Sequence, residues 1–219
     1  MALKVKVCGL KEPARIEQAA ALGAAYVGLV FYPPSPRYVD PARARELVLH
    51  VPAGVETVGV LVDATDAEID AILQTVPLDI LQLHGYETPE RVEAIALRSG
   101  CRVMKAIRVE EAADLEQVPA YIEAADMILF DAKPPRDAGW PGGHGLPFDW
   151  RLLRGLGLGK PWALAGGLHA GNLETAVTLT GAPIIDVSSG VEAKPGVKDP
   201  EKLEAFFAAV RRIADRAAP

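Results

Sequence analysis

The 219-residue sequence predicts an α/β protein whose eight parallel strands close into a (β/α)8 TIM barrel. Short apolar runs rich in β-branched residues recur along the chain and lack clean alternation, which is typical of strands buried on both faces. Segments with helical periodicity separate these runs. Parallel strands joined by helical crossovers must be covered on both faces, and eight of them achieve this by closing.

The predicted elements alternate from the first residues onward. The runs expected as strands are Lys4–Cys8, Tyr26–Phe31, Glu56–Val62, Ile80–His84, Arg102–Ile107, Met127–Asp131, Trp162–Ala165 and Ile184–Val187. The segments expected as helices are Glu12–Leu22, Pro41–His50, Asp66–Thr75, Pro89–Arg98, Glu111–Ala120, Phe148–Leu153, Ala170–Thr178 and Pro200–Ala214. Asp66, Thr88 and Asp199-Pro200 are typical helix-start residues.

An open doubly wound sheet is the competing fold. It would require a Gly-x-Gly-x-x-Gly turn after the first strand, and the sequence there is Cys8-Gly9-Leu10-Lys11-Glu12. The closed barrel is therefore favoured, with residues 1–219 forming a single domain. Barrel enzymes carry their active sites at the carboxyl ends of the strands, so chemistry is expected there.

Composition narrows the class of protein. The net charge of −6 and the pI of about 5.3 argue against a nucleic-acid partner. No apolar run approaches the roughly 20 residues of a membrane span, and the chain starts directly in a predicted strand, so we expect a cytoplasmic protein. Cys8 and Cys101 fall at opposite ends of the barrel and should remain unbridged. The four histidines show no metal-ligand spacing, and no metal is expected.

Two connections are long and irregular. Tyr32–Asp40 follows the second strand and is rich in proline, whereas Ala132–Pro147 follows the sixth strand and is rich in glycine and proline. Long loops in a compact domain are usually functional or disordered, and both loops leave the carboxyl ends of strands. They are expected to border the site.

Two side chains at this face are candidates for proton transfer. Cys8 ends the first strand, where it is either a small buried hydrophobe or a thiolate base or nucleophile. Asp131 ends the sixth strand, and a carboxylate there is costly unless it is paired or useful. Because the two residues would face each other across one mouth, they are expected to act as general base and general acid.

Other residues are suited to holding an anionic ligand. Arg37 lies in the proline-rich loop and could bind a carboxylate by a bidentate contact, unless it is simply solvated. Gly166-Gly167 and Ser188-Ser189-Gly190 follow the seventh and eighth strands, where barrels usually bind phosphate. Gln82, His84 and Asp186 are either substrate contacts or members of a satisfied polar layer inside the barrel.

The motifs together resemble a known family. In order they are Lys6-Val7-Cys8-Gly9-Leu10, Gly28-Leu29-Val30-Phe31-Tyr32, Ser35-Pro36-Arg37-Tyr38, Gln82-Leu83-His84-Gly85, Phe130-Asp131-Ala132-Lys133, Gly142-Gly143-His144-Gly145, Phe148-Asp149-Trp150, Leu164-Ala165-Gly166-Gly167-Leu168 and Asp186-Val187-Ser188-Ser189-Gly190-Val191-Glu192. Over nearly the whole chain this set is similar to the phosphoribosylanthranilate isomerase family of tryptophan biosynthesis, an aromatic amino-acid pathway.

The resemblance implies an aldose–ketose isomerase, a class of intramolecular oxidoreductase, that works without cofactor or metal. It implies an Amadori rearrangement of N-(5-phosphoribosyl)anthranilate to 1-(2-carboxyphenylamino)-1-deoxyribulose 5-phosphate. By position, Asp131 corresponds to the general acid, Cys8 to the general base and Arg37 to the partner of the anthranilate carboxylate. The loops after strands seven and eight correspond to the phosphate site. A monomer and a homodimer are both compatible with the sequence.

Other functions would require different residues in the sequence. Indoleglycerol-phosphate synthase would need a lysine at a strand end and an N-terminal extension, and a pentose-phosphate epimerase would need paired aspartates with metal-binding histidines. An isomerase that also serves histidine biosynthesis would carry Asp at position 8. A non-catalytic phosphate-binding barrel would keep the glycine and serine loops but have no need for Cys8 opposite Asp131.

Overall fold

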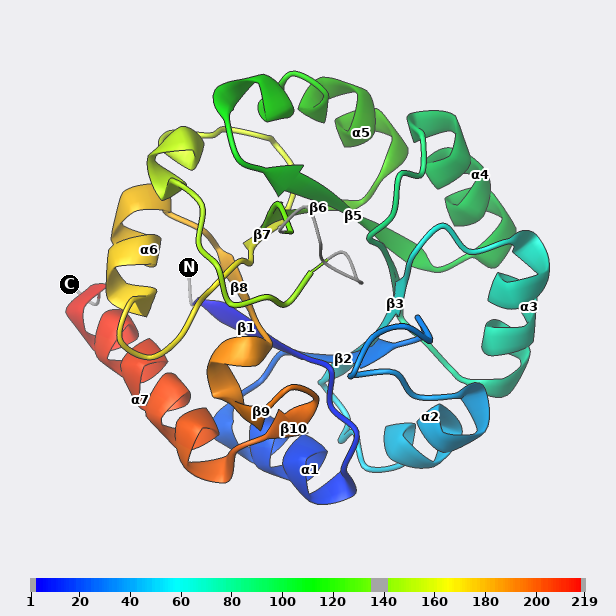
Figure 1. Ribbon diagram of the computed structural model, residues 1–219, viewed down its shortest axis with the longest axis horizontal. Coiled ribbons are helices and arrows are strands. Elements are labelled where there is room, and N and C mark those ends of the chain that lie inside the picture. The colour runs from blue at the N-terminus through cyan, green and yellow to red at the C-terminus, as the bar shows by residue number, and fades with distance from the viewer. Residues whose placement is uncertain (1–2, 135–141, 218–219) are drawn as a thin grey trace.

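Eight parallel strands close into a barrel in the computed structural model, which describes residues 3–134 and 142–217 (Figure 1). The strands are β1 (Lys4–Cys8), β2 (Tyr26–Val30), β3 (Glu56–Leu61), β4 (Ile80–Leu83), β5 (Arg102–Val109), β6 (Met127–Ala132), β7 (Trp162–Leu164) and β8 (Ile184–Val187). Each pairs with its neighbours in sequence, and β8 pairs with β1 to close the ring. The predicted (β/α)8 barrel is thus confirmed.

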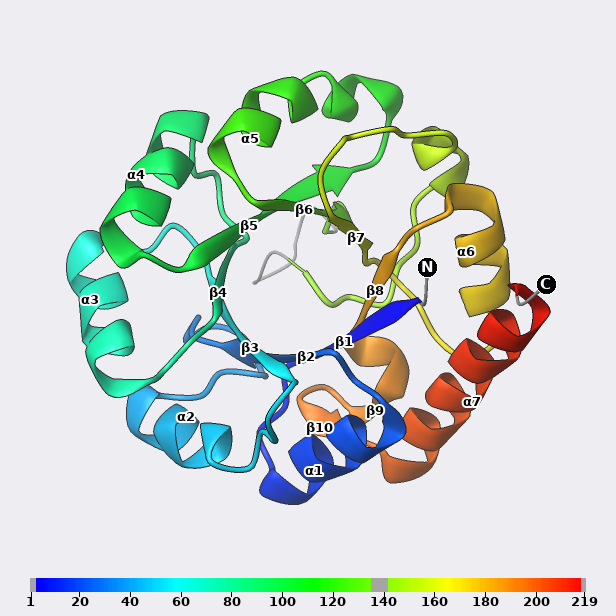
Figure 2. The same ribbon diagram turned by 180° about the vertical axis from the view of Figure 1, so that it is seen from behind.

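Helices surround the barrel, as the two opposite views show (Figures 1 and 2). They are α1 (Pro13–Leu22), α2 (Pro41–Val48), α3 (Asp66–Thr75), α4 (Pro89–Ser99), α5 (Val118–Ala124), α6 (Leu173–Thr180) and α7 (Pro200–Ala217). Helix α3 is capped by Thr65, one residue before the predicted start, through a capping box with Glu68. No helix within the described ranges is long and apolar enough to cross a membrane.

Two predicted helices were wrong in detail. The segment expected as Glu111–Ala120 is a 3-10 turn, η1 (Ala112–Leu115), followed by α5. Pro119 explains the break, because proline is tolerated in the first turn of α5 but not inside a longer helix. The segment expected as Phe148–Leu153 is only the 3-10 turn η2 (Trp150–Leu153), which ends before Gly155, a residue with φ of 73°.

A hairpin that the sequence did not predict follows β8. The short turn η3 (Ser189–Val191) leads into antiparallel strands β9 (Glu192–Lys194) and β10 (Val197–Lys198). Its turn residue Gly196 has φ of 79°, and a Cβ there would lie 2.3 Å from the Pro36 carbonyl oxygen. The hairpin therefore packs closely on the loop after β2.

Buried side chains form separate layers. One cluster fills the space between barrel and helices, and another includes Tyr26, Val58, Met104 and Leu129 from alternating strand positions. Such alternation directs every second residue of a barrel strand inward. Buried charged residues, among them Lys6 and Asp186, interrupt the apolar interior near the carboxyl ends of the strands. That end of the barrel carries the candidate site.

Candidate active site

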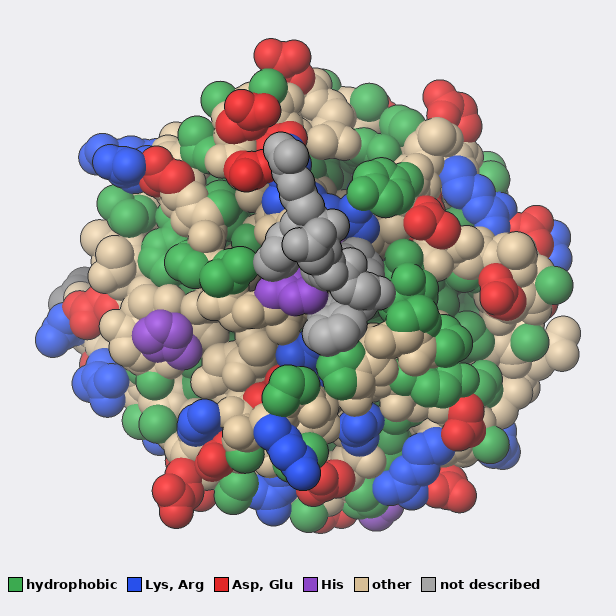
Figure 3. Space-filling view, viewed as in Figure 1, with side chains coloured by type: hydrophobic (Ala, Val, Ile, Leu, Met, Phe, Trp, Pro, Cys, Tyr) green, Lys and Arg blue, Asp and Glu red, His purple; other side chains and the backbone are tan. Residues whose placement is uncertain are grey.

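The carboxyl ends of the strands surround a pocket of about 810 Å³, counted with its open mouth. In the space-filling view, a histidine and nearby Lys or Arg side chains lie close to the centre of this face (Figure 3). The predicted site residues that line the pocket are Cys8, Arg37, Gln82, His84, Asp131, Gly166, Gly167, Asp186, Ser188 and Ser189. A pocket of this size accommodates a small organic ligand.

Gly190 is the predicted site residue placed differently. It is not among the residues lining the described part of the pocket, and a Cβ at this position would lie 1.9 Å from the Leu168 carbonyl oxygen. Gly190 therefore permits close packing between the loops after β7 and β8. Its role in the structure is to bring these loops together.

Cys8 ends β1 and is 8% exposed. Its carbonyl oxygen accepts a hydrogen bond from the Ser188 hydroxyl at 3.1 Å. Burial raises the pKa of the Cys8 thiol above its ordinary value, and the Asp186 carboxylate adds to this rise. The ammonium groups of Lys6 and Lys198 act in the opposite direction. Cys8 and Cys101 are both free thiols, as predicted.

Asp131 lies in β6, opposite the glycine loops. Its Oδ1 accepts a hydrogen bond from the Ala132 amide at 2.9 Å. A Cβ on Gly142 would lie 2.8 Å from Asp131 Oδ2, and a Cβ on Gly166 would lie 3.3 Å from Oδ1. Glycine at both positions thus lets two loop backbones approach the carboxyl group closely.

His84 connects Asp131 to Gln82. The Nε2 atom of His84 lies 3.3 Å from Asp131 Oδ2, and its Nδ1 lies 3.0 Å from the Gln82 amide nitrogen. If the Gln82 amide N–H donates to Nδ1, a neutral ring carries its proton on Nε2, toward Asp131. Gln82 and His84 thus share one side of β4, as their alternation predicts, and both line the pocket.

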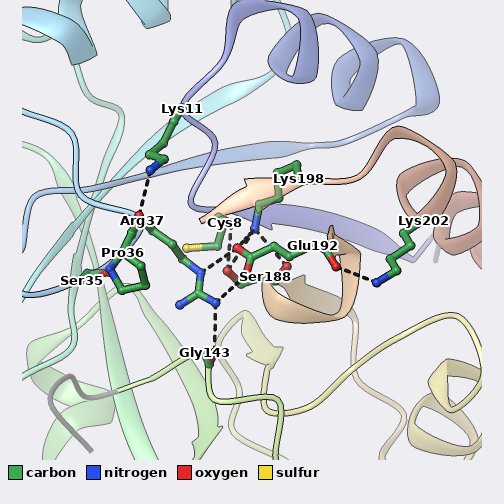
Figure 4. A network of polar contacts seen from close by, with 10 residues as sticks. All are labelled: Cys8, Lys11, Ser35, Pro36, Arg37, Gly143, Ser188, Glu192, Lys198 and Lys202. Carbon is green, nitrogen blue, oxygen red and sulfur yellow. Dashed lines mark hydrogen bonds and ion pairs between the residues drawn. The ribbon is translucent and has the colours of Figure 1, made fainter. Parts of the chain in front are cut away.

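Arg37 is buried rather than solvated. Its Nε and Nη2 donate to the two carboxylate oxygens of Glu192, each at 2.8 Å, and Nη2 also donates to the Gly143 carbonyl oxygen at 3.0 Å (Figure 4). Cβ atoms at Gly9 and Gly143 would lie within 2.6 Å of the Arg37 side chain. The guanidinium is therefore held between two glycine backbones and a carboxylate from the hairpin.

Lys198 joins the same network from β10. Its Nζ donates to Glu192 Oε1 at 2.8 Å and to the Ser188 carbonyl oxygen at 3.0 Å (Figure 4). Burial lowers the pKa of Lys198 to about 8. The Glu192 carboxyl keeps a pKa below its ordinary value, because its bonds to Arg37 and Lys198 outweigh the effect of burial.

The loops after β7 and β8 present backbone to the pocket. Gly166 and Gly167 have φ of 87° and 63°, which favours glycine, and the Asn172 side chain donates to the Gly167 carbonyl oxygen at 2.9 Å. Ser188 and Ser189 line the adjacent wall. Small residues here leave backbone N–H groups accessible to an anionic ligand.

The irregular loops were correctly expected at this face. Ser35 and Arg37 from the loop after β2 line the pocket, as do 142–146 from the loop after β6. Positions 135–141 of the predicted Ala132–Pro147 loop lie outside the described residues. Among the described residues, no group of three His, Cys, Asp or Glu side chains is arranged to hold a metal ion.

Three charged residues at this end of the barrel were not named as site residues from the sequence: Lys6, Glu192 and Lys198. Lys6 had a signal, because a lysine in the middle of a buried strand, two residues before Cys8, faces the same side of that strand. Glu192 was noted only as part of a motif. Lys198 lies in the unpredicted hairpin, and no periodicity in the sequence marks it.

Curated relatives match the chain along its length. The family model for N-(5'phosphoribosyl)anthranilate (PRA) isomerase matches residues 5–209. The N-(5'-phosphoribosyl)anthranilate isomerase of Paracoccus denitrificans is 54% identical over 208 residues, covering 95% of this chain and 97% of the relative. That of Paramagnetospirillum magneticum is 53% identical over 211 residues, covering 96% and 98%.

Solved structures agree with these sequence matches. Phosphoribosyl anthranilate isomerase from Thermotoga maritima has a TM-score of 0.85 and 35% identity, covering 96% of this chain and 99% of that one. A phosphoribosyl anthranilate isomerase in complex with reduced 1-(o-carboxyphenylamino)-1-deoxyribulose 5-phosphate has a TM-score of 0.81 and 33% identity, with coverage of 96% and 99%. The resemblance predicted from the ordered motifs is confirmed: the chain belongs to the N-(5'-phosphoribosyl)anthranilate isomerase family.

Proposed function

We propose that the chain converts N-(5-phosphoribosyl)anthranilate to 1-(2-carboxyphenylamino)-1-deoxyribulose 5-phosphate with Asp131 as general acid and Cys8 as general base. The isomerase activity, a step of tryptophan biosynthesis, follows from membership of the family. The assignment of roles is carried by one observation: a thiol and a carboxyl group, from β1 and β6, line the same pocket.

The first step opens the sugar ring. Asp131, in its protonated form, donates its proton to the furanose ring oxygen while the anthranilate nitrogen supplies electrons to break the C1′–O bond. The product is a Schiff base, cationic at nitrogen. The His84 ring, with Nε2 3.3 Å from Asp131 Oδ2, would keep the carboxyl group in place while its charge changes.

The second step moves the hydrogen. The Cys8 thiolate removes the C2′ proton, and the electrons of the C–H bond neutralise the nitrogen to give an enolamine. Tautomerisation to the ketone places a proton on C1′ and completes the aldose–ketose change. The electrons stay within the substrate throughout, so the net reaction has no external oxidant or reductant.

Charged and small groups would hold the two anionic ends of the substrate. Arg37, fixed along one edge by Glu192, is the proposed partner of the anthranilate carboxylate. The loops containing Gly166-Gly167 and Ser188–Gly190 would offer backbone N–H groups to the phosphate. The solved family member that holds the reduced product analogue supports a pocket for this class of ligand.

Two substitutions test the catalytic assignment. Cys8→Ser and Asp131→Asn should each lower turnover on the order of 10²–10⁴-fold in a fluorescence assay with freshly prepared phosphoribosylanthranilate, while the circular dichroism spectrum stays native. Cys101→Ser, a thiol outside the pocket, is the matched control and should keep wild-type turnover. Wild-type turnover in either pocket variant would remove that residue from its role.

Arg37→Ala tests the carboxylate contact. The expected result is a KM raised about tenfold or more with a smaller change in kcat, because a charge-assisted contact to the substrate is lost. Arg43→Ala, which removes an exposed arginine of α2, should change neither constant. Unchanged KM and kcat for Arg37→Ala would exclude Arg37 from the site.

Cellular setting is a separate proposal. A cytoplasmic location accords with the two free cysteines, because reducing compartments seldom retain disulfides. The chain is expected to act as one domain and as a monomer or homodimer. Sedimentation equilibrium of the purified protein would decide between these two states.

A further inference from the structure

Lys6 is a buried cation next to the reacting thiol. It lies in the middle of β1 and is 0% exposed. Taking an ammonium group out of water costs several kcal/mol unless charged or polar partners compensate it. Lys6 and Cys8 are two residues apart on one strand, so both side chains point to the same side of β1.

The residues around the Lys6 ammonium group come from three strands. Asp186 is directly opposite Lys6 in the β1–β8 register, and its Oδ1 lies 3.0 Å from Lys6 Nζ. Burial acts to lower the pKa of Lys6, whereas Asp186 and the Cys8 thiol act together to raise it. On the other side, Gly28 of β2 is in register with Cys8, and a Cβ there would lie 2.9 Å from Cys8 Sγ and 3.2 Å from Lys6 Nζ. The missing side chain leaves the space in which ammonium and thiol meet.

Other charged groups also affect the pKa of the Cys8 thiol. In the described part of the chain, these include Lys198 from β10, which is itself paired with Glu192. Lys198 donates to Ser188, whose hydroxyl in turn donates to the Cys8 carbonyl oxygen. Cys8 thus has the ammonium group of Lys6 on its own strand and that of Lys198 on the hairpin, and Figure 4 shows Lys198 close to Cys8.

We propose that Lys6 is a positioning residue that favours the thiolate form of Cys8 at the pocket, and that Asp186 moderates this effect by sharing the Lys6 charge. The inference deepens the proposed function and depends on it for its catalytic meaning. Thiolate, not thiol, is the effective base, and burial alone opposes its formation. The Lys6 ammonium group next to the thiol counters part of that opposition without contacting the substrate.

The test measures the Cys8 thiol directly. In a Cys101→Ser background, Cys8 is the sole thiol, and its pKa follows from ultraviolet thiolate absorbance and from the pH dependence of alkylation by iodoacetamide. Lys6→Met, which keeps the apolar stem, should raise the thiol pKa so that alkylation at neutral pH slows about tenfold or more. Asp186→Asn should lower the pKa and accelerate alkylation, because the full Lys6 charge then faces the thiol.

The opposite signs separate this proposal from a structural role. If Lys6 and Asp186 only stabilised the barrel, both substitutions would disturb Cys8 in the same direction, and that result would overturn the proposal. Lys105→Met, which breaks another buried ion pair, is the matched control and should leave the Cys8 pKa unchanged. Should a single variant fail to fold, Lys6→Met/Asp186→Asn removes both charges, and its thiol pKa should fall between those of the single variants. A double-variant pKa outside that range would count against the proposal.

Activity then tests the link to catalysis. The pH midpoint of the acid limb of the kcat/KM profile should rise in Lys6→Met and fall in Asp186→Asn, in step with the thiol pKa. If the thiol pKa moves as expected and the limb does not, the base assignment of Cys8 is wrong while the Lys6–Cys8 coupling stands. If the thiol pKa does not move in Lys6→Met, the coupling itself is refuted.

Discussion

Two buried lysine–carboxylate pairs on different sides of the barrel have different surroundings. Lys105 of β5 bonds Glu87 at 2.7 Å and the Gly85 carbonyl oxygen at 2.9 Å, and Glu87 accepts bonds from the amides of Gly85 and Asp63. Lys6 of β1 bonds Asp186 and contacts the Cys8 thiol. The first pair is bound to backbone, and the second is bound to a reactive side chain.

The comparison shows that a buried lysine can either stabilise the fold or stabilise a reactive group. Burial lowers the pKa of Lys105 below its ordinary value, and the attraction of Glu87 only partly compensates. Burial also acts to lower the pKa of Lys6, but the Asp186 and Cys8 groups outweigh it, so the net pKa is raised. Lys6, with the Asp186 carboxylate and the Cys8 thiol as neighbours, can stabilise a thiolate. Lys105, which bonds Glu87 and backbone carbonyl groups, mainly stabilises the turn after β4.

The largest effect on stability is expected from Lys105→Met. It leaves the Glu87 carboxylate buried without its cation, which should lower the free energy of unfolding by about 3–5 kcal/mol. Urea denaturation followed by circular dichroism measures this change. A loss below about 1 kcal/mol would mean that the Lys105–Glu87 pair does not hold the turn after β4, and the contrast with Lys6 would fail.

Gly28→Ala should affect activity more than stability. Its methyl group would crowd Cys8 Sγ and Lys6 Nζ, so turnover should fall about tenfold or more, with a cost of about 1–3 kcal/mol in the free energy of unfolding. Gly157→Ala is the control, because nothing lies within 4 Å of a Cβ there. Equal turnover in the two variants would show that the space beside Cys8 is not needed.

The smallest expected effect is a pH dependence of stability. Burial acts to raise the pKa of Glu87. The Lys105 ammonium group and the backbone hydrogen bonds that Glu87 accepts outweigh burial and hold this pKa below its ordinary value of 4.5. A depressed folded-state pKa contributes stability above pH 4.5 that is lost as the pH falls through the lower value. Urea unfolding from pH 6 to about pH 3 should therefore show a flatter decline for Glu87→Gln than for wild type. Identical declines would contradict this.

Much of the barrel was predictable because its signals are local. Each strand is a short apolar run, and proline or threonine marks several helix starts, as at Pro41 and Thr88. Strand ends predict where the site lies, so Cys8 and Asp131 could be named as facing residues. Predictions failed where local signals conflict, as at Pro119, or where a hairpin of two- and three-residue strands left no periodic pattern.

By itself, the sequence determined the closed barrel, the face of the site and the family, through periodicity and ordered motifs. Only the tertiary structure decided the electrostatic partners. Lys6 and Asp186 are 180 residues apart, and Arg37 and Glu192 are 155 apart. Their contacts exist because β8 closes on β1 and the hairpin folds over the loop after β2. The spacing of charges along a chain does not reveal such pairs, because their distances depend on ring closure and not on local conformation.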